Sequence, residues 1–77
     1  MNTSSKQVKS IIPDTSEYIV SAARKLFSDF TYLGVSMEDI AKRLHISKDA
    51  LYYHFTSKTE IYEKVLEEVF EDLKLNI

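Results

Sequence analysis

Residues 47–55, with the sequence Ser-Lys-Asp-Ala-Leu-Tyr-Tyr-His-Phe, have the pattern of a very short helix. Ser47 is a suitable N-cap, and Leu51 and Phe55 are four residues apart, so both fall on one helical face. We expect that face to anchor the segment to a hydrophobic core. The remaining aromatic and polar side chains then point elsewhere; they are Lys48, Tyr52, Tyr53 and His54. The sequence predicts an anchored helix with hydrogen-bonding groups on its free side.

A second short helix is predicted just upstream, over residues 37–44. Ser36 and Asp39 are spaced to cap its start from both sides. The short gap before residue 47 is typical of a helix-turn-helix, whose second helix enters a DNA major groove. His45 stands in this turn, where positive φ is often needed; histidine tolerates such a φ better than most residues, but not freely. We expect a strained or slightly reshaped turn.

Longer helices are predicted on both sides of this pair. The first should begin near Asp14, and its core stripe comprises Ile19, Ala22, Ala23, Leu26, Phe27 and Phe30. The last should begin with a capping box formed by Ser57 and Glu60. Its apolar stripe covers about half the circumference, which is wider than so small a domain needs. A further apolar partner for this helix is therefore expected, and Leu66, Phe70 and Leu73 are its predicted exposed apolar residues.

Four segments of the sequence resemble the N-terminal DNA-binding domain of the TetR family of bacterial transcriptional repressors. These segments are Ile40-Ala41, Leu44-His45-Ile46-Ser47, Leu51-Tyr52-Tyr53-His54-Phe55 and Ser57-Lys58. The resemblance extends over about residues 15–73 and implies an all-α fold. A three-helix, homeodomain-like helix-turn-helix would occupy residues 14–58, with the recognition helix at about 47–54. Residues 57–77 would start a fourth, linking helix that leads to a C-terminal regulatory domain missing from this sequence.

The resemblance also implies a function and its partners. The expected protein is a sequence-specific regulator of transcription, a repressor that binds a palindromic operator in double-stranded DNA as a homodimer. The dimer contacts and the site for a small-molecule effector would lie in the C-terminal domain. No cofactor is expected. Residues 1–13 are predicted to be a flexible arm, with a phosphate-backbone or minor-groove contact by Lys6 and Lys9 as the alternative.

Candidate DNA-binding residues follow from position in the helix-turn-helix and from the resemblance. Lys48 is the best candidate for base readout, because an ammonium reaches guanine O6 or N7, and Ala50 is small enough to touch a thymine methyl. The resemblance places further residues along the phosphate backbone: Ser36, Ser47, Tyr52, Tyr53, His54 and Lys58. Local alternatives stay open, since the serines are also caps, one tyrosine could face the core, and Lys58 could be solvated.

Two positions depart from the family's pattern. Thr31 and His45 stand where the family usually has glycine, and the single glycine of this chain is Gly34. The end of the first long helix, or the path of the loop after it, is therefore expected to differ. Tyr32 matches an aromatic position of the family and is predicted to pack.

Charge and composition limit the other function classes. The 77 residues carry a net charge of −2, but residues 1–58 are net +2 and residues 59–77 net −4. The acidic excess therefore falls on the last predicted helix. There is no cysteine, the histidines lack metal-ligand spacing, and no nucleophile–base pair or membrane span is evident. A non-catalytic, cytoplasmic protein is expected; the alternative function is a protein-interaction module that binds a partner through the last helix.

Overall fold

The computed structural model describes residues 14–75, which form four helices. In chain order these are α2 (Thr15–Phe30), α3 (Met37–Leu44), α4 (Lys48–His54) and α5 (Lys58–Leu75). The described residues contain no strand, and the predicted all-α class is confirmed. The predicted arm at residues 1–13 lies outside the described residues.

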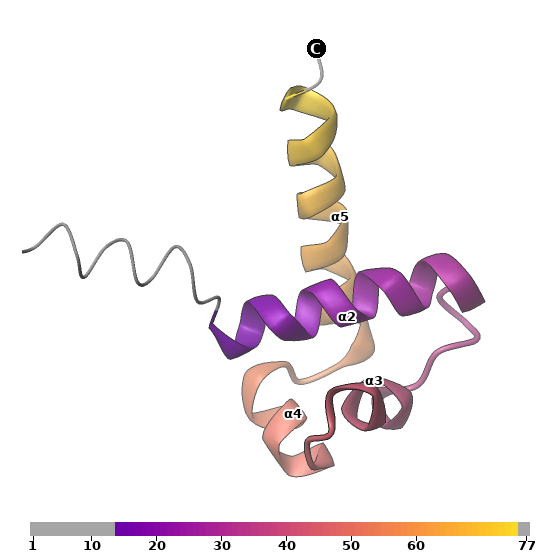
Figure 1. Cartoon of the computed structure of the whole chain (residues 1–77), viewed down its shortest axis with the longest axis vertical. Helices are drawn as coiled ribbons and strands as arrows, with labels where there is room; N and C mark the ends of the chain where they lie inside the picture. Colours follow the sequence, from indigo (N-terminus) through magenta and orange to yellow (C-terminus); the bar gives the residue numbers. More distant parts are fainter. Residues whose placement is uncertain (1–13, 76–77) are drawn as a thin grey trace, which may run out of the picture.

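The helices are arranged around the crossing of α2 and α5 (Figure 1). Helix α2 packs against both α5 and α3, and α3 packs against α4. Figure 1 shows α3 and α4 together below α2, while the C-terminal part of α5 extends beyond the other helices. The short helices therefore lie at one end of the molecule and the end of α5 lies at the other.

The hydrophobic core lies where the four helices meet. Each helix contributes one large side chain with no exposed surface: Ile19, Ile40, Leu51 and Ile61. The core is completed by Val20, Ala23, Leu26, Phe27, Val35, Ala41, Phe55 and Val65. The prediction was wrong for Phe30, which is 60% exposed. Its angular position fits the stripe, but it is the last residue of α2 and stands beyond the core.

The start of α2 is capped by a side chain, whereas its end is formed by a residue with positive φ. At its start Asp14 Oδ1 accepts a hydrogen bond of 3.0 Å from the Glu17 backbone N–H, which confirms the predicted cap. At its end Thr31 has φ 66° and ψ 167°, a region that suits glycine far better than a β-branched residue. The glycine of this loop has no positive φ. Gly34 is needed for space, because a Cβ there would collide with the Phe30 carbonyl oxygen.

Candidate nucleic-acid interface

The turn between α3 and α4 is held by a left-handed histidine. His45 has φ 58° and ψ 41°, and its N–H donates to the carbonyls of Ala41 and Lys42. The N–H of Ile46 also donates to the Ala41 carbonyl, at 3.0 Å. These bonds satisfy carbonyls that the end of α3 would otherwise leave unpaired. The positive φ that the sequence indicated for this turn is present at His45. The strain or reshaping expected for the turn stays a prediction.

Serine caps begin both short helices. Asp39 N–H donates to Ser36 Oγ at 3.0 Å, and Ser36 N–H donates to Asp39 Oδ2 at 2.9 Å, so the predicted two-sided cap of α3 is present. The backbone N–H of Ser36, with a further contribution from its hydroxyl, lowers the pKa of the Asp39 carboxyl. At the start of α4, Ala50 N–H donates to Ser47 Oγ at 3.0 Å. The caps fix where each short helix begins.

Helix α4 has a buried side and a free side. Leu51 is fully buried, and Phe55, the residue that follows α4, is 5% exposed. We call the exposed residues of α4 that carry base or phosphate predictions the reading surface; they are Lys48, Ala50, Tyr52 and Tyr53. The exposed fractions of the two tyrosines are 44% and 85%, so neither faces the core.

His54 differs from the reading surface because it is half-buried. Its Nδ1 lies 3.5 Å from Ser16 Oγ on α2, and its ring packs edge-on against the Tyr53 ring at 5.1 Å. The imidazole thus lies between α4 and the first turn of α2. The predicted phosphate contact of His54 stays a prediction.

The side chain of Lys58 points back into the protein. Its Nζ donates to the carbonyl oxygens of Tyr32 at 2.7 Å and Val35 at 2.8 Å. It also lies 4.1 Å from the centroid of the Tyr32 ring. The alternative of a solvated Lys58 is therefore wrong. The predicted contact with a phosphate stays a prediction, and the sequence pattern missed these partners in the loop after α2.

The predicted capping box at the start of α5 is half correct. Glu60 N–H donates to Ser57 Oγ at 3.2 Å, as expected. The carboxylate of Glu60, however, accepts from the backbone N–H of Thr56 at 2.7 Å and from its hydroxyl at 2.9 Å. The backbone bond, followed by the hydroxyl, lowers the pKa of Glu60. The carboxylate passes Ser57 because the hydroxyl and N–H of Thr56 offer it two donors.

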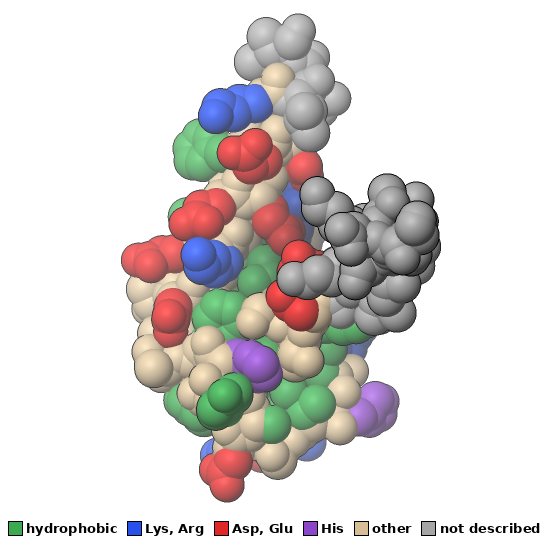
Figure 2. Space-filling view, turned by 90° about the vertical axis from the view of Figure 1, so that its left-hand side faces the viewer, with side chains coloured by type: hydrophobic (Ala, Val, Ile, Leu, Met, Phe, Trp, Pro, Cys, Tyr) green, Lys and Arg blue, Asp and Glu red, His purple; other side chains and the backbone are tan. Residues whose placement is uncertain are grey.

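Acidic side chains gather on α5, away from the reading surface. Arg24 of α2 pairs with two of them, at 2.9 Å to Asp72 and 3.4 Å to Glu68. The hydrogen bond to Asp72 is the main reason that the pKa of Arg24 is raised. Figure 2 shows acidic groups along the α5 half of the face that it displays. Repulsion of a phosphate backbone would therefore be weakest at the α3–α4 end.

Between residues 14 and 75, no group of three or more histidine or carboxylate side chains is placed to hold a metal ion. None of the helices over that range combines the length and the apolar character that crossing a membrane requires.

Comparison with known proteins gives consistent similarities. Residues 19–65 match the family described as bacterial regulatory proteins, tetR family. The negative transcriptional regulator IcaR of the biofilm operon icaADBC from Staphylococcus epidermidis is 44% identical over 52 residues, which is 68% of this chain and 28% of the relative. The same regulator from Staphylococcus aureus strain Newman is 46% identical over 55 residues, 71% of this chain and 30% of the relative. The chain thus spans less than a third of the length of these relatives.

Proposed function

The chain belongs to the tetR family of bacterial regulatory proteins, and on this basis we propose that it binds double-stranded DNA with α4 in the major groove. One observation carries the proposal. Leu51 and Phe55 are buried and fix one side of α4, while Lys48, Tyr52 and Tyr53 of the same helix remain exposed. A recognition helix needs this division, because it must be fixed to its domain while its other side reaches DNA.

The predicted contacts other than that of Lys58 each have a physical role in this proposal. Lys48 and Ala50 are in the first turn of α4, from which a recognition helix reads base edges. The hydroxyls of Tyr52 and Tyr53 and the imidazole of His54 would donate to phosphate oxygens and hold the register. Ser36 and Ser47 stand at helix N-termini, which attract phosphate. The basic Lys42 and Arg43, exposed on α3, would add non-specific attraction.

The regulatory part of the proposal extends beyond these residues. The relatives are named negative transcriptional regulators, and we propose that this chain likewise serves repression. A dimer would place two reading surfaces about 34–36 Å apart, one DNA turn, on a palindromic operator. Dimer contacts and a small-molecule effector site would belong to a separate regulatory domain. Exposed apolar side chains on α5 support a partner on that helix; they are Leu66 (40%), Phe70 (67%) and Leu73 (54%).

Replacing the first-turn lysine tests the proposed reading surface. A preferred site is first selected from random duplexes with the parent protein. Lys48→Ala should then reduce discrimination between that site and random DNA by about 1–3 kcal/mol, because it removes a base contact. Lys64→Ala removes the same charge from α5 and is the matched control. If Lys48→Ala and the parent select the same site with equal discrimination, Lys48 does not read bases.

A protein-interaction module is the second candidate function. It is favoured by the same exposed apolar residues of α5, which form a surface suited to docking a partner. The two candidates differ in their response to salt. Binding through phosphates weakens steeply as ionic strength rises, whereas docking of an apolar helix does not. A mobility-shift titration at increasing salt therefore tests one candidate against the other.

A further inference from the structure

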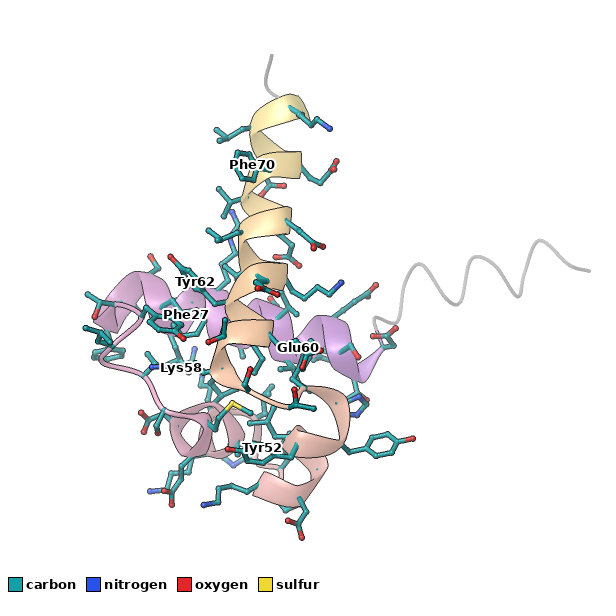
Figure 3. The ribbon with its side chains drawn as sticks, turned by 180° about the vertical axis from the view of Figure 1, so that it is seen from behind. Phe27, Tyr52, Lys58, Glu60, Tyr62 and Phe70 are labelled. Carbon is teal, nitrogen blue, oxygen red and sulfur yellow. The ribbon has the colours of Figure 1, made fainter. Side chains whose placement is uncertain are left out.

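Lys58 occupies an unfavourable place for a cation unless it has partners. It is the first residue of α5, and the N-terminus of a helix carries a partial positive charge. Figure 3 shows Lys58 at the base of α5. Lys58 is half-buried, and two carbonyl oxygens of the protein take the place of part of the water that would otherwise surround its charge.

The partners of this ammonium all belong to the loop after α2. Carbonyl oxygens of Tyr32 and Val35 accept at 2.7 and 2.8 Å, and the Tyr32 ring face lies 4.1 Å away. Two of the three N–H groups are thereby used on neutral acceptors, and hydrogen bonds with one charged partner are among the stronger ones in proteins. The loop is thus fastened to α5 through its backbone.

The side chain of Tyr32 fastens the same loop a second time. Its hydroxyl lies 2.9 Å from Thr59 Oγ1, in the first turn of α5. Its ring centroid lies 5.6 Å from that of Phe27 and 4.7 Å from that of Tyr62. We call the set of Lys58, Tyr32, Val35 and Thr59 the loop clamp.

The loop clamp ends one residue before the cap of α3. Val35 is buried and is followed directly by Ser36, whose N–H and hydroxyl form the cap. We propose that Lys58 is a positioning residue: its ammonium holds residues 32–35, and through them Ser36 and the start of α3, at a fixed place relative to α5. It acts on DNA binding through this loop and not as a phosphate ligand. This inference rests on the proposed DNA-binding function.

The first test uses the free protein, so that it does not depend on DNA. Lys58→Met keeps most of the aliphatic stem and removes the three donors; Lys64→Met is the control for the lost charge. Amide hydrogen exchange at Val35 and Ser36 should accelerate by at least about tenfold in Lys58→Met, because tenfold corresponds to losing one hydrogen bond to a charged group and the variant loses two. Exchange at Ala23 and Val65, in the cores of α2 and α5, should change less. Equal acceleration at all four amides, or none at the loop, would overturn the positioning role.

The second test uses DNA and separates positioning from phosphate binding. With a positioning lysine, Lys58→Met weakens binding while the slope of log K against log salt stays that of the parent. With a phosphate ligand, the slope becomes shallower by about 0.9, and the inference is overturned. If the parent protein does not bind DNA, the proposed function fails. The hydrogen-exchange experiment still tests whether Lys58 holds the loop.

A third measurement needs no variant, in case Lys58→Met does not fold. In the parent protein, the Lys58 ammonium should give slowly exchanging NMR signals with couplings across the hydrogen bonds to the Tyr32 and Val35 carbonyl carbons. Rapid exchange with water and no such couplings would contradict the clamp.

Discussion

Helix α4 and the outer half of α5, residues 66–74, are both helical for different reasons. Helix α4 has 7 residues, too few to be stable in isolation, and depends on buried Leu51, on Phe55 beyond its end and on the Ser47 cap. The outer half of α5 contains no buried side chain. It continues a helix already nucleated below it, which costs little per added residue. The short helix α4 is ordered by its contacts with the core, whereas the long helix α5 continues beyond the core.

The difference bears on function. Because α4 is fixed by few residues on one side, its free side is available for polar and aromatic groups without loss of stability. In the outer half of α5 only Val69 packs against the core, while Leu66, Phe70 and Leu73 stay exposed. Helix α4 therefore combines a fixed position with a free polar surface. The outer half of α5 presents an apolar surface suited to a partner.

The largest expected effect comes from removing an anchor of α4. Leu51→Ala should lower the free energy of unfolding by about 2–5 kcal/mol, because it empties a fully buried site. Phe70→Ala, at the 67% exposed position of α5, should change it by no more than about 0.5 kcal/mol. Urea unfolding followed by circular dichroism measures both. Similar losses of unfolding free energy in the two variants would mean that the outer half of α5 is packed in solution. That result would contradict the contrast between α4 and α5.

A smaller effect is expected from the cap of α4. Ser47→Ala removes the acceptor for the Ala50 N–H and should cost about 1 kcal/mol of unfolding free energy. Ser28→Ala, at an exposed position inside α2, is the matched control and should be neutral or slightly stabilising, because alanine favours helices. The same denaturant titration measures both variants. A neutral Ser47→Ala would show that burial alone orders α4, which would sharpen the comparison in another direction.

The smallest expected effect is on stability in acid. It is small because the two carboxylates involved are accessible to solvent. The pKa values of Asp39 and Glu60 are lowered by hydrogen bonds that the unfolded chain lacks. Their contribution to stability is therefore fully present above the ordinary values of 3.8 and 4.5, and is lost as pH falls through the lower folded values. Asp39→Asn with Glu60→Gln should flatten the fall in melting temperature below about pH 4.5. Glu67→Gln, on the outer half of α5, is the charge control. If Glu67→Gln flattened the dependence of melting temperature on pH equally, the bonds of Asp39 and Glu60 would not be its cause.

Much of the fold could be predicted from spacing within single segments. The caps at Asp14, Ser36 and Ser47 and the left-handed turn at His45 depend on residues at most a few positions apart. Helical geometry brings such neighbours together whatever the rest of the chain does. For the same reason the buried side of α4 followed from two apolar residues four apart.

The candidate site was less predictable where a side chain had a choice of partners. The sequence predicted a capping box in which Glu60 pairs with Ser57, but the N–H and hydroxyl of Thr56 offer the Glu60 carboxylate two donors. It also left Thr31 as a departure from the family's pattern, although that residue adopts the positive φ that glycine would otherwise supply. Phe30 had the correct angular position but stands at the end of α2, and periodicity does not reveal where a core ends.

The sequence by itself determined the helical class, the helix starts and the two-sided character of α4, because these rest on local geometry and on apolar spacing. Tertiary structure alone decided the partners of Lys58, which lie 26 and 23 residues earlier in the chain. It also decided the pairing of Arg24 across to α5, over 44 residues to Glu68. Long charged side chains have many rotamers, and their partners are set only when packing brings distant backbone and charges within reach.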